Sequence, residues 1–281
     1  MSGGLQAQAA AENFPVAGRL LPPRLRRDLT ALYGFARSVD DIGDEGPTTG
    51  EQRLAALDEV DADLDRLFTH QPARLGFVAG LTATVAEHDL PREPFERLVA
   101  ANRQDQSVTR YATWDQLREY CRLSADPVGR LVLAVTGSSS PERVAASDRI
   151  CTALQVLEHL QDVAEDAHAG RIYLPEQDMR RFGVDRQNLT APTASRPLRA
   201  LVAFEAVRAR DLLESGSELV GALHGAARLA VSGFVAGGLA TLRALSAAGW
   251  DVLAQPVRPS RRVTMTTATG LLVHAARRGG R

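Results

Sequence analysis

Two acidic clusters, each near the C-terminal end of a predicted helix, constrain the fold of this chain more than any other feature. The stronger one lies in the segment 154–175, LQVLEHLQDVAEDAHAGRIYLP. With about 100° per residue, a helix here has one apolar side and one acidic side. The acidic side consists of Glu158, Asp162, Glu165 and Asp166, with no Lys or Arg from Glu158 to Asp166. Like charges one turn apart repel, and the C-terminal end of a helix is itself negative. The cluster therefore requires a cation.

The same arrangement occurs near the start of the chain, in the run ALYGFARSVDDIGDEG. A helix predicted from Pro23 carries a polar face made up of Tyr33, Arg37, Asp40, Asp41 and Asp44. Gly46 and Pro47 should end this helix, so acids again crowd a C-terminal end. Two such ends facing each other would hold divalent cations. Mg²⁺, with Mn²⁺ as the alternative, is usually bound by a few carboxylates together with phosphate oxygens and water. The pattern predicts a site that ionises a diphosphate.

The composition narrows the range of functions. A net charge of −1 and a pI of about 6.6 give no reason to expect nucleic acid as a partner. All 33 basic residues are Arg, which excludes Schiff-base chemistry on Lys and suits bidentate contacts with phosphate. Arg37 and Arg171 each lie within two turns of an acidic cluster. We expect them to contact diphosphate oxygens, with an ion pair inside the protein as the alternative.

Three other kinds of site find no support. Counted from Asp41, a calcium loop would need a carboxylate where Gln52 stands. The 6 His residues show no grouping typical of zinc ligands. No GxGxxG motif follows a strand, so no NADPH is expected. His159, beside the acidic cluster, is either a packing residue or one that orients water.

Helical periodicity runs through the whole chain, and no segment shows the alternating β-branched runs typical of strands. We expect an all-α fold, in which residues 12–281 form a single-domain bundle of roughly ten helices around a central cavity. Residues 1–11 are expected to be a flexible N-terminus. Single helices are predicted at 75–88 and 198–223, and a surface loop at 183–197. The helix predicted at 114–135 contains Pro127 and Gly129, which should kink it.

The first residues lack the basic and apolar regions of a signal peptide, and no run of 18 apolar residues is free of charge. The expected location is the cytoplasm, with peripheral association at the inner face of the membrane. The tail favours such association, because the apolar segment Leu271 to Val273 precedes Arg277, Arg278 and Arg281.

The two acidic motifs also carry a specific resemblance. DDIGD (40–44) and QDVAED (161–166), the latter followed closely by GRIYLP, resemble the aspartate-rich motifs of the squalene/phytoene synthase family. The likeness covers nearly the whole chain from Glu12. ENFPVAGRLLPPRLR near the start and YCRLSADPVGRLVL from Tyr120 are similar to the hydroxysqualene branch of that family.

The resemblance implies an isoprenoid synthase type of fold and a set of site residues. Asp40, Asp44, Asp162 and Asp166 match the family's metal-binding aspartates, and Tyr33, Arg37 and Tyr173 match residues on or after the motifs. Glu158 stands where the family commonly has Asn, and it could still bind a metal. The resemblance places Tyr120, Ser124, Ala125, Val128 and Gly129 along the cavity. Phe14 is either ordinary core or a wall of the cavity.

Three functions remain open. The leading hypothesis is Mg²⁺-dependent ionisation of presqualene diphosphate, rearrangement of the cation and its capture by water to give hydroxysqualene and diphosphate. Glu158, Glu165 and His159 are the groups that could hold this water. The enzymatic alternative is head-to-head condensation of farnesyl or geranylgeranyl diphosphate. The third hypothesis is a non-catalytic lipid-binding or assembly factor. Contact with other enzymes of the squalene pathway is a further expectation.

Overall fold

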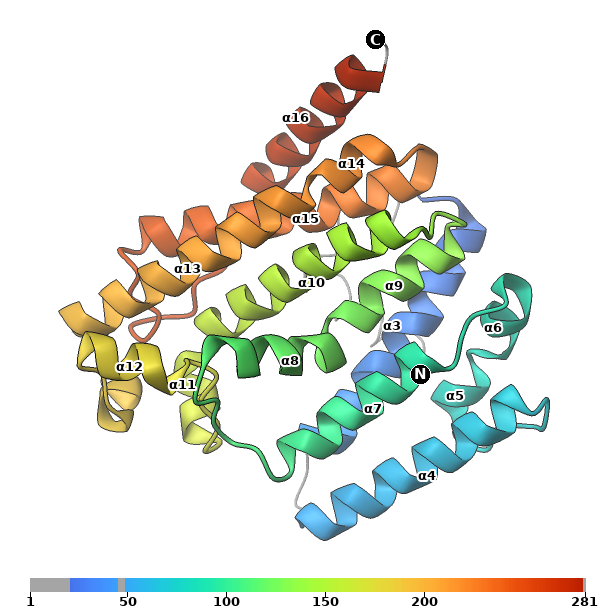
Figure 1. Ribbon diagram of the computed structural model, residues 1–281, viewed down its shortest axis with the longest axis horizontal. Coiled ribbons are helices and arrows are strands. Elements are labelled where there is room, and N and C mark those ends of the chain that lie inside the picture. Colours follow the sequence, from blue (N-terminus) through green and yellow to red (C-terminus); the bar gives the residue numbers. More distant parts are fainter. Residues whose placement is uncertain (1–20, 45–48, 280–281) are drawn as a thin grey trace.

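The computed structural model describes residues 21–44 and 49–279, and within these ranges every long regular element is a helix (Figure 1). The helices are α3 (Pro23–Asp44), α4 (Gly50–Phe68), α5 (Gly76–Ala79), α6 (Thr82–His88), α7 (Glu93–Asp105), α8 (Trp114–Ser124), α9 (Asp126–Val135), α10 (Pro141–Gln161), α11 (Val163–His168), α12 (Glu176–Phe182), η1 (Arg186–Thr190, a 3₁₀ helix), α13 (Arg196–Gly216), α14 (Glu218–Ala222), α15 (Gly225–Ala247) and α16 (Arg261–Gly279). The described residues contain no strand, only an isolated bridge between Arg110 and Ile172. The all-α prediction is confirmed. Phe14 and the helix end at Gly46-Pro47 lie outside the described residues.

The arrangement of the bundle places the two acidic motifs on helices that a third helix joins. α10 occupies the middle of the bundle and packs against α13, α9, α15, α8 and α14. α3 packs against α7, α4 and α9. Since α9 contacts both α3 and α10, it holds the helix of the first motif at a fixed place relative to the helix of the second.

Two hydrophobic clusters stabilise this arrangement. One surrounds α3, α4 and α7, where Phe35 and Phe95 are fully buried and meet edge to face at 5.2 Å between ring centroids. The other lies among α10, α13 and α15, with Leu157 and Leu198 among its buried members. α9 and α15 contribute residues to both clusters. The clusters therefore meet along these two helices.

Three of the predicted boundaries are wrong. The helix expected at 75–88 is divided into α5 and α6 around Gly80, a residue with poor helix propensity. The helix expected at 198–223 breaks at Ser217, directly after the close approach of Gly216 to α10. The segment 183–197 is not all loop, because Asp185 and Asn188 form a capping box that begins η1.

The predicted kink is present as a full break between α8 and α9. Ala125, between the two helices, has φ −116° and ψ −49°, a φ well away from the usual helical value of about −63°. Pro127 has no N–H, and the N–H of Val128 donates to the Ala125 carbonyl at 3.1 Å. Just after the break, a Cβ on Gly129 would lie 2.3 Å from Ser147 Oγ and 2.5 Å from Cys151 Sγ of α10. Gly129 thus permits the close packing of α9 on α10.

The C-terminal helices are the most apolar and the most basic parts of the fold. Among the described residues, α15 is long and apolar enough to cross a membrane, but 67% of that window is buried in the protein, as in a core helix. On α16, Val273 is exposed, whereas Leu271 packs against the core.

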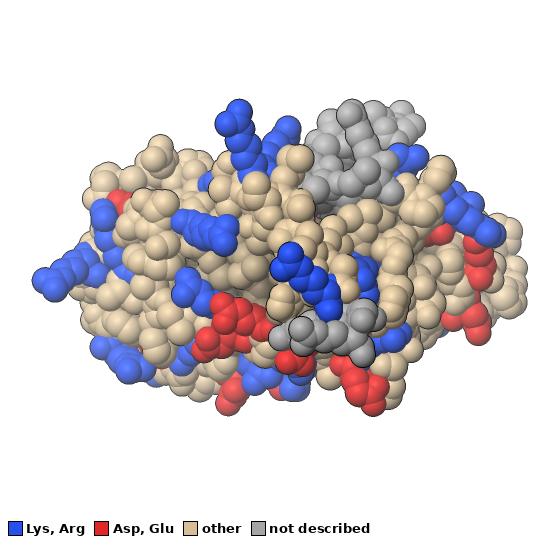
Figure 2. All heavy atoms as spheres, turned by 90° about the horizontal axis from the view of Figure 1, so that it is seen from above, with Lys and Arg blue, Asp and Glu red and all other residues tan. Residues whose placement is uncertain are grey.

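Seen from above, arginines stand out over the surface and acidic side chains gather in smaller patches (Figure 2). Membrane association through the tail stays a prediction.

The contact at Gly129 generates the first prediction. Replacing Gly129 by Ala puts a methyl group into the α9–α10 contact and should destabilise the protein by about 1–3 kcal/mol. The measurement is urea unfolding. The control is Gly270→Ala in the exposed part of α16, where a Cβ meets nothing within 4 Å. This control should be neutral or stabilise by up to ~1 kcal/mol. Equal stabilisation by both substitutions would contradict the close contact.

Candidate active site

The first motif occupies one face of the C-terminal half of α3. Spacings of four, three and four residues place Tyr33, Arg37, Asp40 and Asp44 on this face. Arg37 Nε forms an ion pair with Asp41 Oδ1 at 2.8 Å, which is the alternative that the sequence left open for this arginine. Asn102 of α7 donates from Nδ2 to Asp40 Oδ1 at 2.9 Å. Its approach requires Gly43, because a Cβ there would lie 2.2 Å from Asn102 Oδ1.

The sequence led us to expect the second motif within one continuous helix. The structure instead divides it between two helices. α10 ends at Gln161, Asp162 is its C-cap with φ −103°, and α11 carries Glu165 and Asp166. Gln161 donates from Nε2 to the Val257 carbonyl at 2.5 Å, which ties the motif to the connection between α15 and α16. The break distributes the like charges of the motif between two helices.

Arg171 joins the two motifs. Its Nη1 lies 2.5 Å from Asp44 Oδ1 of the first motif. Its backbone N–H donates to the carbonyl of Asp166 in the second motif at 2.8 Å, after the chain reverses at Gly170 with φ +88°. Arg171 Nε is buried and has no hydrogen-bond partner in the described part of the chain. A guanidinium group that pairs with a carboxylate through Nη1 and has no partner at Nε is suited to bind an additional anion.

The carboxyl groups near Arg171 resist ionisation. Asp40 is an exposed residue, but desolvation of its carboxyl group by the surrounding atoms raises its pKa to about 6, against the hydrogen bond from Asn102, and Asp44 raises it further. Burial also raises the pKa of Asp166 to about 7, with a further contribution from the charge of Asp162. The pKa of Asp162 is raised by burial and by Glu165, while Arg258 opposes the shift. These groups are short of positive charge even with Arg171 beside them. A divalent cation, which prefers carboxylate oxygens, fits this donor set.

Asp105, at the end of α7, is a site residue that the sequence analysis did not identify. Tyr120 Oη donates to Asp105 Oδ2 at 2.6 Å, and Tyr173 Oη donates to Oδ1 at 3.2 Å. Burial raises the pKa of Asp105 to about 6, although both hydroxyls and Arg171 lower it. No periodicity or motif marks this residue, because its partners come from distant parts of the chain. Arg258, which acts on Asp162, was missed for the same reason.

Aromatic rings cover the inner side of this network. Tyr173 stacks on the His159 ring at 3.7 Å between centroids and on Tyr111 at 5.8 Å, and Tyr120 lies 5.5 Å from Tyr173. Burial lowers the pKa of His159 to about 3, helped by the charge of Arg171, so His159 is neutral near pH 7. Its Nδ1 lies 4.0 Å from Asp166 Oδ2. The rings present a continuous π surface beside the acidic groups.

The remaining predicted site residues lie at different distances from this centre. Glu158 and Glu165 are exposed, and Gln155 Nε2 donates to Glu158 Oε2 at 3.4 Å. Val128 is half-buried against the first hydrophobic cluster, and Gly129 faces α10. A small pocket of about 10 Å³ is lined by His159, Val163, Asp166, Arg171, Ile172, Tyr173, Leu174 and Leu189. This volume has room for about one water molecule, far less than the ~300–1,000 Å³ of most ligand pockets.

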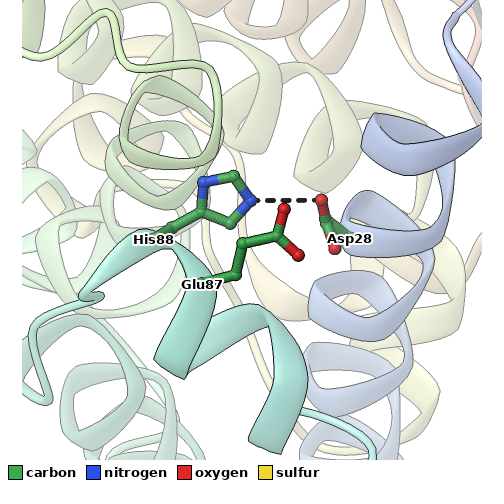
Figure 3. Close-up of side chains that lie close together, drawn as sticks. All are labelled: Asp28, Glu87 and His88. Atoms are coloured by element: carbon green, nitrogen blue, oxygen red, sulfur yellow. Dashed lines mark hydrogen bonds and ion pairs between the residues drawn. The ribbon is translucent and has the colours of Figure 1, made fainter.

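A second group of metal-ligand type, Asp28, Glu87 and His88, has a different character (Figure 3). Arg27 Nη2 contacts both Asp28 and Glu87 at 2.7 Å, and Arg24 Nε contacts Glu87 at 2.5 Å. His88 lies 3.1 Å from Asp28. Two arginines already neutralise these acids, so we interpret the group as an ion-pair network that joins α3 to α6.

Comparisons with known proteins agree with the geometry. The family model of squalene/phytoene synthase matches residues 7–268. The hydroxysqualene synthase of Zymomonas mobilis is 38% identical over 76% of this chain and 71% of its own length, and that of Rhodopseudomonas palustris is 36% identical over 74% and 70%. The crystal structure of a squalene synthase from Alicyclobacillus acidocaldarius has a TM-score of 0.79 at 38% identity, covering 88% of this chain and 93% of that one. A dehydrosqualene synthase shares the fold, with a TM-score of 0.86 at 22% identity over 98% and 95% of the two chains.

The raised pKa of Asp105 predicts a pH-dependent stability. The folded protein holds the Asp105 proton up to about pH 6, whereas the unfolded chain releases it near its ordinary pKa of 3.8. This contribution to the free energy of unfolding is therefore present at low pH and lost as pH rises through 6. Asp105→Asn lacks the titration, so its stability relative to wild type should increase by about 1 kcal/mol between pH 5 and pH 8.

The measurement is urea unfolding at both pH values. Asp211→Asn, at an exposed position on α13, serves as the control. A difference between Asp105→Asn and wild type that stays constant from pH 5 to pH 8 would contradict the raised pKa.

Proposed function

Since the chain belongs to the squalene/phytoene synthase family, as its motifs predicted, we propose that it is a hydroxysqualene synthase. In this reaction presqualene diphosphate loses diphosphate, the cation rearranges, and water captures it to give hydroxysqualene. The observation that carries the proposal is the meeting of the two acidic motifs at Arg171, which pairs with Asp44 and leaves Nε uncommitted. Such an arrangement would suit a metal ion and a diphosphate bound together.

In the ionisation of presqualene diphosphate, the acidic residues of the two motifs would bind the metal and the arginines would contact the diphosphate. Asp40, Asp44, Asp162 and Asp166 would hold Mg²⁺, and exposed Glu158, four residues before Asp162, would join them. When bound, Mg²⁺ stabilises the negative charge that develops on the departing diphosphate. Arg171 would exchange its contact with Asp44 for the diphosphate oxygens, and Arg258 lies near Asp162 to assist. Arg37 would leave Asp41 in the same way.

The aromatic cluster would shield the carbocation. Tyr120 and Tyr173 both donate to Asp105, so their hydroxyl groups are directed to the carboxylate. An aromatic face attracts a cation through its negative quadrupole. Asp105 therefore acts as a positioning residue for both rings. The hydrocarbon would extend past Val128 along α9 and α15, where the two hydrophobic clusters meet.

Capture by water requires no reductant. The bond between carbon and the diphosphate oxygen breaks, a lone pair of water forms the new carbon–oxygen bond, and the released diphosphate takes the extra proton. We therefore propose that NADPH is not needed. The second candidate is head-to-head condensation, because the chain is also similar to phytoene synthases, such as that of Arthrospira platensis with 32% identity. The complete set of aspartates in both motifs favours an enzyme over a lipid-binding or assembly factor.

The test is incubation with presqualene diphosphate, Mg²⁺ and ¹⁸O-labelled water without NADPH, with products identified by mass spectrometry. We expect hydroxysqualene that carries the label. Chelator should abolish the reaction, and Asp162→Asn should slow it by on the order of 10²-fold or more, since metal stabilisation of the leaving group contributes several kcal/mol. Squalene formed only with NADPH would show the assignment to be wrong. So would consumption of farnesyl diphosphate while presqualene diphosphate remains untouched.

A further inference from the structure

Ser124, the last residue of α8, carries a hydroxyl group that the fold does not use. Its Oγ is shielded from solvent and has no hydrogen-bond partner in the described part of the chain, while other atoms of the residue are partly exposed. A serine within a helix commonly donates to the carbonyl one turn earlier, as Ser232 does to Arg228 at 2.6 Å. Ser124 makes no such bond. A buried hydroxyl without a partner is unfavourable, so its retention needs a reason other than stability.

The backbone beside Ser124 is also short of donors. In a continuous helix, the carbonyls of Leu123 and Ser124 would accept from residues 127 and 128. Pro127 has no N–H, and the N–H of Val128 donates to Ala125 instead. The break between α8 and α9 thus brings together one hydroxyl and two carbonyl groups, close along the chain to buried Asp126, which accepts a hydrogen bond from Thr152 Oγ1 at 3.0 Å. Such a group of donors and acceptors can hold a water molecule.

The helical spacing places this polar group beside the reacting part of the site. Ser124 follows Tyr120 by four residues, so the two side chains lie on the same face, roughly 5–6 Å apart at Cβ. Tyr120 belongs to the aromatic cluster with Tyr173 next to Asp105 and Arg171. Val128, on the other side of the break, packs against the hydrophobic cluster that surrounds α3, α4 and α7. Ser124 therefore stands between the anionic end of the site and its apolar end.

We propose that Ser124 holds the water that captures the carbocation, an inference that rests on the proposed function. A rotation about χ1 to another staggered position moves Oγ from its unpartnered place toward the exposed side of the residue. There the hydroxyl and the free carbonyls bind one water and direct a lone pair to the cation. The carbon–oxygen bond forms from that lone pair, and the proton passes to the diphosphate that has already left.

The test compares two substitutions of equal volume, Ser124→Thr and Ser124→Val, which differ only in the hydroxyl group. Each variant is incubated with presqualene diphosphate and Mg²⁺, and the ratio of hydroxysqualene to hydrocarbon elimination products is measured. Because the ratio refers to substrate that has reacted, it does not depend on how much of the variant folds. We expect Ser124→Thr to retain the alcohol, and Ser124→Val to lower the ratio about tenfold, the effect of one lost hydrogen bond.

Ser232→Ala, which removes a buried hydroxyl with a partner, should leave the ratio at the wild-type value. Equal ratios for Ser124→Thr and Ser124→Val would overturn the role of Ser124. Failure of the proposed function has a different signature, because wild-type protein would then form no alcohol from presqualene diphosphate. The two outcomes are therefore distinguishable in one set of incubations.

Discussion

The mutual repulsion of carboxylates at two helix ends is the constraint on which the rest of this site depends. Desolvation raises the pKa values of the Asp40, Asp162 and Asp166 carboxyl groups, and neighbouring acids add to the effect. Arg171 joins the two motifs, because its side chain contacts Asp44 and its backbone N–H contacts the Asp166 carbonyl. Even with Arg37 beside Asp41 and Arg258 acting on Asp162, the pKa values of these acids stay raised. The site is therefore built to accept further positive charge.

Several local features of the fold follow from this need to bring the motifs together. Gly43 lets α7 approach α3 closely enough for Asn102 to donate to Asp40. Gly170, with φ +88°, permits the chain reversal that brings the backbone N–H of Arg171 to the carbonyl of Asp166. Gly129 lets α9 pack closely on α10 and hold it relative to α3. Each glycine stands at a close approach or a turn on which the geometry of the site depends.

The sequence predicted the helical fold and the two motifs because both depend on local spacing. Acids and apolar residues repeat with helical period, and Pro127 predicts an interruption of the helix because it has no N–H. Contacts between distant segments were not accessible in this way. Nothing near Asp105 in the sequence indicates that Tyr120 and Tyr173 converge on it. The break at Asp162 was missed as well, since periodicity continues across it and the packing of α11 decides the direction of the chain.

The central claim is that the two acidic motifs together form the metal and diphosphate site. The most direct measurement is an anomalous difference map from crystals grown with Mn²⁺ and inorganic diphosphate. The account predicts peaks among Asp40, Asp44, Asp162 and Asp166, with diphosphate at Arg171 and the contact between Arg171 and Asp44 broken. Peaks confined to Asp28, Glu87 and His88, or an intact pair of Arg171 with Asp44 and no metal beside it, would contradict the account.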